Sequence, residues 1–119
     1  MRYLLLWIAL EALFGADSEI TFRISQRIAF FISGQAEAKE TFRRMKRAYN
    51  WRNKIVHGLR HRELKREESE QVLHDTETAI RKALRRILLD AAMVGNFVDN
   101  RREPYLDELA YQPSAVPAQ

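Results

Sequence analysis

The sequence predicts an all-α protein, an up-and-down antiparallel four-helix bundle followed by a short C-terminal extension. Helix breakers are scarce: the 119 residues include only four glycines and three prolines, and two of the prolines lie in the last seven residues. Apolar residues recur at helical spacing in four separate segments. Short connections join these segments, which favours antiparallel packing of neighbouring helices.

The first helix is expected at residues 2–14. It is apolar apart from its first residue and Glu11, and Gly15 provides a natural C-cap. A helix that is apolar nearly all round needs cover on more than one side, from the other helices or from a second copy of the chain. The apolar run of about a dozen residues is too short for a bilayer, which needs about 20. It is therefore expected to be a core helix, with no membrane association.

The next two helices are expected on either side of Ser33-Gly34. Asp17 or Ser18 is expected to cap the second helix. The third starts near Gln35, and its inward positions follow spacings of three and four residues. These positions are Ala38, Phe42, Met45, Tyr49, Arg52 and Val56. Arg52 stands where a leucine is expected, so its charge requires a buried partner, a cleft or a ligand.

The fourth helix is expected over roughly residues 65–94, closed by Gly95-Asn96. Its inward positions are Val72 or Leu73, Thr76, Ile80, Ala83, Ile87 and Ala91. Residues 1–96 thus form the expected bundle, and residues 97–119 form the extension. Pro104 is expected to open a short helix there, and residues 112–119 are expected to be a disordered tail.

Positive charge is concentrated around the end of the third helix. Between Arg43 and Arg66 the chain has ten lysines and arginines against one acid, Glu63. Such a block favours capture of a polyanion, although a solvated helix face can also be rich in basic residues. The absence of cysteine excludes disulfides, thiolate metal sites and a cysteine nucleophile, and agrees with a cytoplasmic location.

The segment around Arg52, Asn53 and His57 contains residue types suited to phosphate chemistry. An arginine can hold a phosphoryl oxygen in a bidentate fork, and a histidine can transfer a proton near neutrality. Asparagine can orient either group through hydrogen bonds. The spacing resembles the Arg-x(4–6)-His signature of the HEPN superfamily. Asn53 and the ending Val56-His57-Gly58 are most similar to the subgroup called Apea-like HEPN.

The resemblance covers about residues 5–92. Softer matches to the family in the first two expected helices are Trp7, Ala9, Leu10, Glu11, Leu13, Glu19, Ile20, Arg27 and Ala29. It implies a bundle that forms a homodimer, with two motifs facing a shared cleft, and acts as a metal-independent endoribonuclease without a cofactor. It also implies a role in toxin–antitoxin or antiviral defence, so an antitoxin or a fused domain is a possible partner.

On this hypothesis the catalytic residues are Arg52, Asn53 and His57, and the substrate is RNA. Residues expected to bind RNA are Arg43, Arg47, Trp51, Lys54, Arg60 and Arg62. Glu11 and Tyr49 are expected to support the site, with Glu11 as the obvious ion-pair partner of Arg52. No metal ligand set is expected, because Gly58 interrupts the helix between His57 and His61.

Helix geometry restricts how the motif can work. Asn53 and His57 lie about 40° apart on a regular helix, whereas Arg52 and His57 lie about 140° apart. Arg52 and His57 can meet one phosphate only if the helix unwinds near Gly58 or if two subunits each contribute a residue. The alternatives to catalysis are a helical module that binds RNA or a protein partner, and a nucleotide-binding accessory domain.

Overall fold

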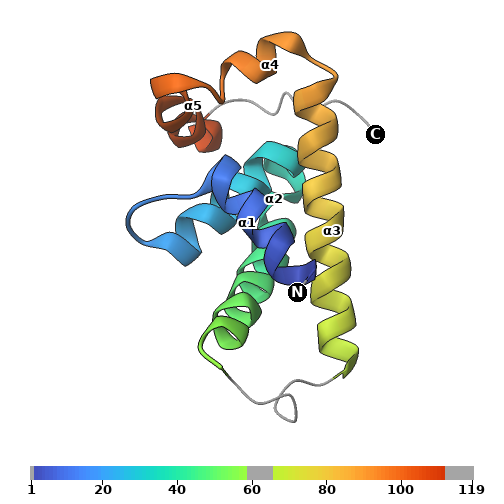
Figure 1. Cartoon of the computed structure of the whole chain (residues 1–119). Helices are drawn as coiled ribbons and strands as arrows, with labels where there is room; N and C mark the ends of the chain where they lie inside the picture. Colours follow the sequence, from blue (N-terminus) through green and yellow to red (C-terminus); the bar gives the residue numbers. More distant parts are fainter. Residues whose placement is uncertain (1, 59–65, 112–119) are drawn as a thin grey trace.

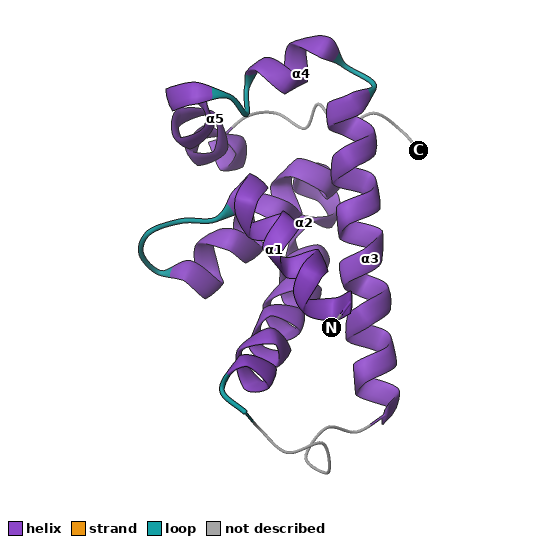
Figure 2. Ribbon diagram, in the orientation of Figure 1, coloured by secondary structure: helices purple, strands orange, loops and turns teal. Residues whose placement is uncertain are grey.

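The computed structural model describes residues 2–58 and 66–111, and this part of the chain is all-helical, with no strand (Figure 2). The elements are α1 (Arg2–Phe14), α2 (Ile20–Val56), α3 (Arg66–Leu88), α4 (Ala91–Gly95), η2 (Asp99–Arg101), α5 (Arg102–Glu108) and η3 (Leu109–Tyr111), where η marks a 3-10 helix. In Figure 1, α1 crosses α2 beside α3, and α4 and α5 lie at one end of α3. None of these helices is long and apolar enough to cross a membrane.

Glycine determines the end of α1 and the kink within α2. At Gly15 an added Cβ atom would lie 2.5 Å from the carbonyl oxygen of Glu11, so no other residue fits there without a shift. Gly34 has a left-handed φ of 68° and divides α2 into a first limb, residues 20–33, and a second limb, residues 35–56. The predicted break at Gly34 is therefore confirmed. The predicted cap at Asp17 or Ser18 is wrong, because left-handed Glu19 occupies the N-cap position without a side-chain bond.

The prediction of one continuous helix over residues 65–94 is also wrong. The chain leaves α3 at Leu88, and extended Asp90 caps the separate helix α4 by accepting a hydrogen bond from the Ala92 amide at 3.0 Å. Ala91, which was expected to face inward, is consequently exposed. The inward positions before the break are confirmed at Thr76 and Ala83, which are fully buried.

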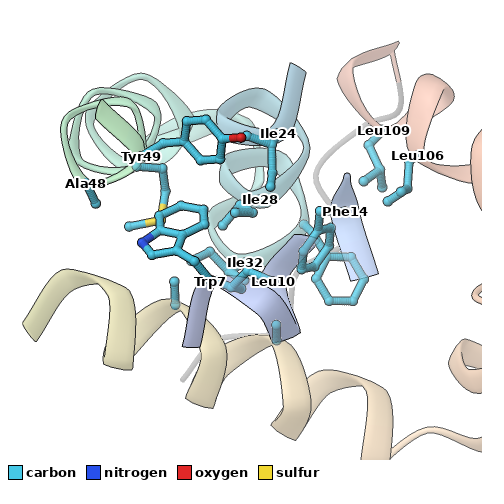
Figure 3. Close-up of a cluster of buried hydrophobic side chains, with 14 of the residues drawn as sticks. Trp7, Leu10, Phe14, Ile24, Ile28, Ile32, Ala48, Tyr49, Leu106 and Leu109 are labelled. Atoms are coloured by element: carbon cyan, nitrogen blue, oxygen red, sulfur yellow. The ribbon is translucent and has the colours of Figure 1, made fainter. Parts of the chain in front are cut away.

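One side of α1 lies at the centre of the core. Trp7, Leu10 and Phe14 are fully buried among the limbs of α2 and α3 (Figure 3). Leu106 and Leu109 of the C-terminal extension belong to the same cluster, so the extension packs on the helices that precede it. The other side of α1 is not covered by the described residues: Leu5 is 63% exposed and Ile8 is 65% exposed.

Candidate functional site

The motif lies at the C-terminal end of the second limb of α2, at the opposite end of the molecule from α4 and α5 (Figure 1). The helix continues to Val56, and the His57 amide still donates to the Asn53 carbonyl at 2.9 Å. Gly58, with φ of 77°, then ends the helix while its amide donates to the Ile55 carbonyl at 3.1 Å. His57 is exposed at this end.

Arg52 makes three contacts with neighbouring side chains. Its Nε lies 2.9 Å from Oε1 of Glu11 on α1, and its Nη1 donates to Oδ1 of Asn53 at 3.0 Å. The guanidinium carbon also lies 5.2 Å from the centre of the Tyr49 ring. The expected partner Glu11 is thus in place. The side chain of Arg52 remains 25% exposed, and its Nη2 has no hydrogen-bond partner among residues 2–58 and 66–111.

The aromatic residues of the motif belong to the core. Tyr49 is 4% exposed and meets Trp7 edge-on, with ring centres 5.1 Å apart. Burial raises the pKa of Tyr49, the nearby Glu11 charge adds to this increase, and the Arg52 charge opposes it. Trp51 is only 5% exposed because it lies one turn after the buried Ala48 on the inner face of the helix. The ring of Trp51 is therefore not exposed for the expected stacking on an RNA base.

The structure does not show the unwinding near Gly58 that would bring Arg52 and His57 of one chain together. Since α2 stays helical to Val56, Arg52 and His57 project about 140° apart. Arg52 is directed toward Glu11 of α1, whereas His57 is exposed to solvent. The helix does not unwind to bring both groups together. One chain alone therefore does not present Arg52 and His57 to a common phosphate.

Apart from Trp51, the expected RNA-binding residues that fall within the described ranges are exposed cations. The side chain of Arg43 is 64% exposed and lies 3.6 Å from Glu40. That of Arg47 is 50% exposed and lies 3.9 Å from Asp75. Lys54 is exposed. The remaining two, Arg60 and Arg62, lie outside the described residues.

Sequence reasoning missed Asp75. This α3 residue is 5% exposed, and its Oδ1 accepts a hydrogen bond from Gln71 at 2.9 Å while Oδ2 faces the guanidinium of Arg47. Its place beside Thr76, on the inward stripe, was the available signal. Within the described ranges, no group of three or more histidine, aspartate or glutamate side chains is placed to hold a metal ion.

Comparisons with protein-family models, curated proteins and solved structures found no match. The likeness to Apea-like HEPN domains therefore rests on the motif and on the helical pattern of the sequence. The structure adds the positions of the motif side chains, and these form the basis of the following proposal.

Proposed function

We propose that this chain is an Apea-like HEPN four-helix bundle with a C-terminal extension, and that it acts as a homodimeric, metal-independent endoribonuclease. One observation carries the proposal: Nη2 of Arg52 has no partner among the described residues and lies at a partly exposed position, five residues before an exposed histidine. A guanidinium nitrogen in this position is available to donate to a phosphate oxygen. The all-helical fold and the exposed cations on α2 agree with this function.

The reaction follows from the residue types. Without a metal, the RNA 2′-hydroxyl attacks the adjacent phosphate, the bond to the 5′-oxygen breaks, and a 2′,3′-cyclic phosphate and a 5′-hydroxyl result. His57 serves as general acid or base, which contributes about 10²–10⁴-fold. Nη2 of Arg52 stabilises the charge that develops on the phosphorane oxygens. Asn53 holds Arg52 through its Oδ1, and Arg43, Arg47 and Lys54 bind flanking phosphates.

Two features support a homodimer. Arg52 and His57 project about 140° apart, so the site is complete only if Arg52 of one subunit acts beside His57 of the partner subunit. In addition, Leu5 and Ile8 expose an apolar stripe on α1 that a second copy would cover. The two features are independent, because the first concerns catalytic geometry and the second concerns apolar area.

The direct test uses purified protein on total RNA, with and without excess chelator. Cleavage is expected in both conditions and should leave cyclic-phosphate ends. His57→Ala and Arg52→Ala should each abolish cleavage, while an RNA with 2′-hydrogens in place of hydroxyls should bind and remain intact. Full activity in either variant would refute the assignment of the site.

Mixing the two inactive variants tests the composite site. If the subunits share the site, a heterodimer of Arg52→Ala and His57→Ala chains regains one intact pair, and part of the activity returns. Light scattering on the parent protein gives its oligomeric state. A fully active monomer would exclude the composite arrangement.

A specific observation favours a second function, a non-catalytic helical module that binds RNA or a partner. The carboxylate of Glu11 already neutralises Arg52 at 2.9 Å, as it would if the arginine only joined α1 to α2. A parent protein that binds the 2′-hydrogen strand but leaves RNA intact would establish this module and exclude the ribonuclease.

A further inference from the structure

Three phenylalanines line an open groove at the kink of α2. Phe22 and Phe30 come from the first limb and Phe42 from the second, and Lys39 lies at the same groove. The groove has a volume of about 290 Å³, close to the lower limit for small-molecule sites. Phe22 is 49% exposed, and its ring meets that of Phe42 edge-on at 5.5 Å. Phe30 and Phe42 are partly exposed, so the groove presents aromatic surface on which a flat ligand can stack.

The groove lies at one end of a continuous outer face of the second limb. From Phe42 the chain reaches Lys46, Asn50, Asn53 and His57 in steps of four, four, three and four residues. On a regular helix these five side chains fall within about 80° of one another, over a length of about 22 Å. Lys46, Asn50 and His57 are exposed, and Phe42 and Asn53 are partly exposed.

The charge on this face is positive. The second limb carries seven basic residues and two acids, Glu37 and Glu40. Glu40 is about 160° from Phe42 around the helix, and it is paired with Arg43 and Arg44. Lys39 and Lys46 form no ion pair within the described part of the chain. A polyanion following this face therefore meets lysine and amide groups between the groove and His57.

We propose that the groove stacks an unpaired base of single-stranded RNA whose backbone follows this face of α2 to His57. Aromatic platforms beside a basic track are the usual means of holding single strands, because every base has a flat face that can stack. Phe22, Phe30 and Phe42 thus take the role expected of the buried Trp51. The inference rests on the proposed function for the choice of RNA, but it does not depend on cleavage.

The test measures the binding of a labelled single strand with 2′-hydrogens, which the proposed reaction cannot cut, by fluorescence anisotropy. Phe42→Leu and Phe22→Leu keep apolar volume but remove the ring, and each should weaken binding about tenfold. Phe42→Trp should retain the affinity of the parent. Leu88→Ala, at an exposed apolar residue on α3, is the matched control and should have no effect. Thermal melting verifies that each variant is folded.

Salt dependence separates stacking from charge. The phenylalanine variants should leave the slope of affinity against salt unchanged, whereas Lys46→Gln should reduce it by about 0.7, the contribution of one phosphate contact in a single strand. A duplex should bind more weakly than the strand, because its paired bases cannot enter the groove. Equal affinity of parent and Phe42→Leu, or of duplex and single strand, would overturn the inference.

Two further outcomes distinguish this inference from an interface between copies and from the proposed ribonuclease activity. If Phe22→Leu and Phe42→Leu change self-association and leave the affinity for the strand intact, the groove is an interface between copies, and the inference falls. If binding depends on Phe42 but the parent leaves RNA with 2′-hydroxyls uncut, the groove is supported as an RNA-binding site and the ribonuclease activity is refuted.

Discussion

Two arginines of α2, Arg27 and Arg52, illustrate the difference between a structural and a candidate catalytic group. Arg27 of α2 has a side chain that is 3% exposed, and its Nη1 and Nη2 both have partners in the protein. It donates to the Gly15 carbonyl at 2.8 Å, to Glu103 at 2.5 Å and to Asp107 at 3.0 Å. Arg52 is 25% exposed and pairs with Glu11, and its Nη2 has no partner among the described residues.

The difference concerns how much of each guanidinium remains available. Arg27 joins the end of α1 to α5, and it has no terminal nitrogen left for a ligand. Arg52 is oriented by Glu11, Asn53 and the Tyr49 ring. Its Nη2 nevertheless has no partner among the described residues, and part of its side chain is exposed to solvent. An oriented but incompletely paired arginine suits transition-state stabilisation, which requires donors that are already in position.

The largest expected effect follows from replacing each arginine by lysine. Arg52→Lys should lower the single-turnover rate of RNA cleavage at least about 100-fold, because an ammonium group cannot reproduce the planar fork. Arg27→Lys should leave the rate per folded molecule unchanged. Rates are measured at saturating enzyme, with the folded fraction determined by circular dichroism. Similar losses in both variants would remove the functional distinction between the two arginines.

Stability should show the reverse order. Arg27→Ala is expected to cost about 3 kcal/mol of unfolding free energy, the lower end for a buried pair, because its carboxylate partners are about half exposed. Arg52→Ala should cost about 1 kcal/mol or less, as its ion pair is partly solvated. Urea unfolding of both variants provides the measurement. A cost at Arg52 equal to that at Arg27 would identify Arg52 as structural.

What the sequence could predict depended on the range of the interaction. Glycine acts locally, so the helix ends at Gly15, Gly34 and Gly58 followed from their positions. The break at Asp90 was missed because the apolar spacing continues across it, and only the cap chemistry of an aspartate distinguishes it. The pairing of Arg27 with Glu103 and Asp107 spans 76 and 80 residues, and no periodic pattern could reveal it.

The candidate site was predicted in part for similar reasons. The ion pair of Arg52 with Glu11 was foreseen because each is a charged residue on an otherwise apolar helix stripe. The burial of Trp51 was not foreseen, since it depends on which side of α2 its neighbours cover. The phenylalanine groove forms only where the two limbs of α2 meet, so its members resemble ordinary core residues in the sequence.

Glu11→Gln tests how far Glu11 limits the availability of Arg52, because it removes the neutralising charge while keeping a hydrogen-bond acceptor. Binding of the uncleavable RNA strand should tighten about fivefold, corresponding to about 1 kcal/mol for one charge at this distance in a solvated setting. Stability should fall by less than about 1 kcal/mol. Anisotropy titrations of parent and variant provide the measurement. Unchanged affinity would mean that Arg52 stays paired with Glu11 when the strand is bound.

The smallest effect concerns the Arg27 side of the comparison and appears at low pH. Burial alone raises the pKa of Asp107, but hydrogen bonds and charge from Arg27 and Arg23 outweigh it, and the pKa lies below its ordinary 3.8. The folded protein therefore binds fewer protons here than the unfolded chain does. The stabilisation is fully present above pH 3.8 and is lost as the pH falls through the lowered folded value.

Because the Asp107 side chain is 53% exposed, solvent screening should keep this contribution under about 1 kcal/mol. The parent should exceed Asp107→Asn in unfolding free energy at pH 7, and the difference should vanish in acid, where both chains carry a neutral group at this position. Urea unfolding at pH 7 and at pH 3 or below measures it. A difference that stays constant across this range would show that Asp107 contributes through packing, and that the Arg27 cluster is held together without this charge.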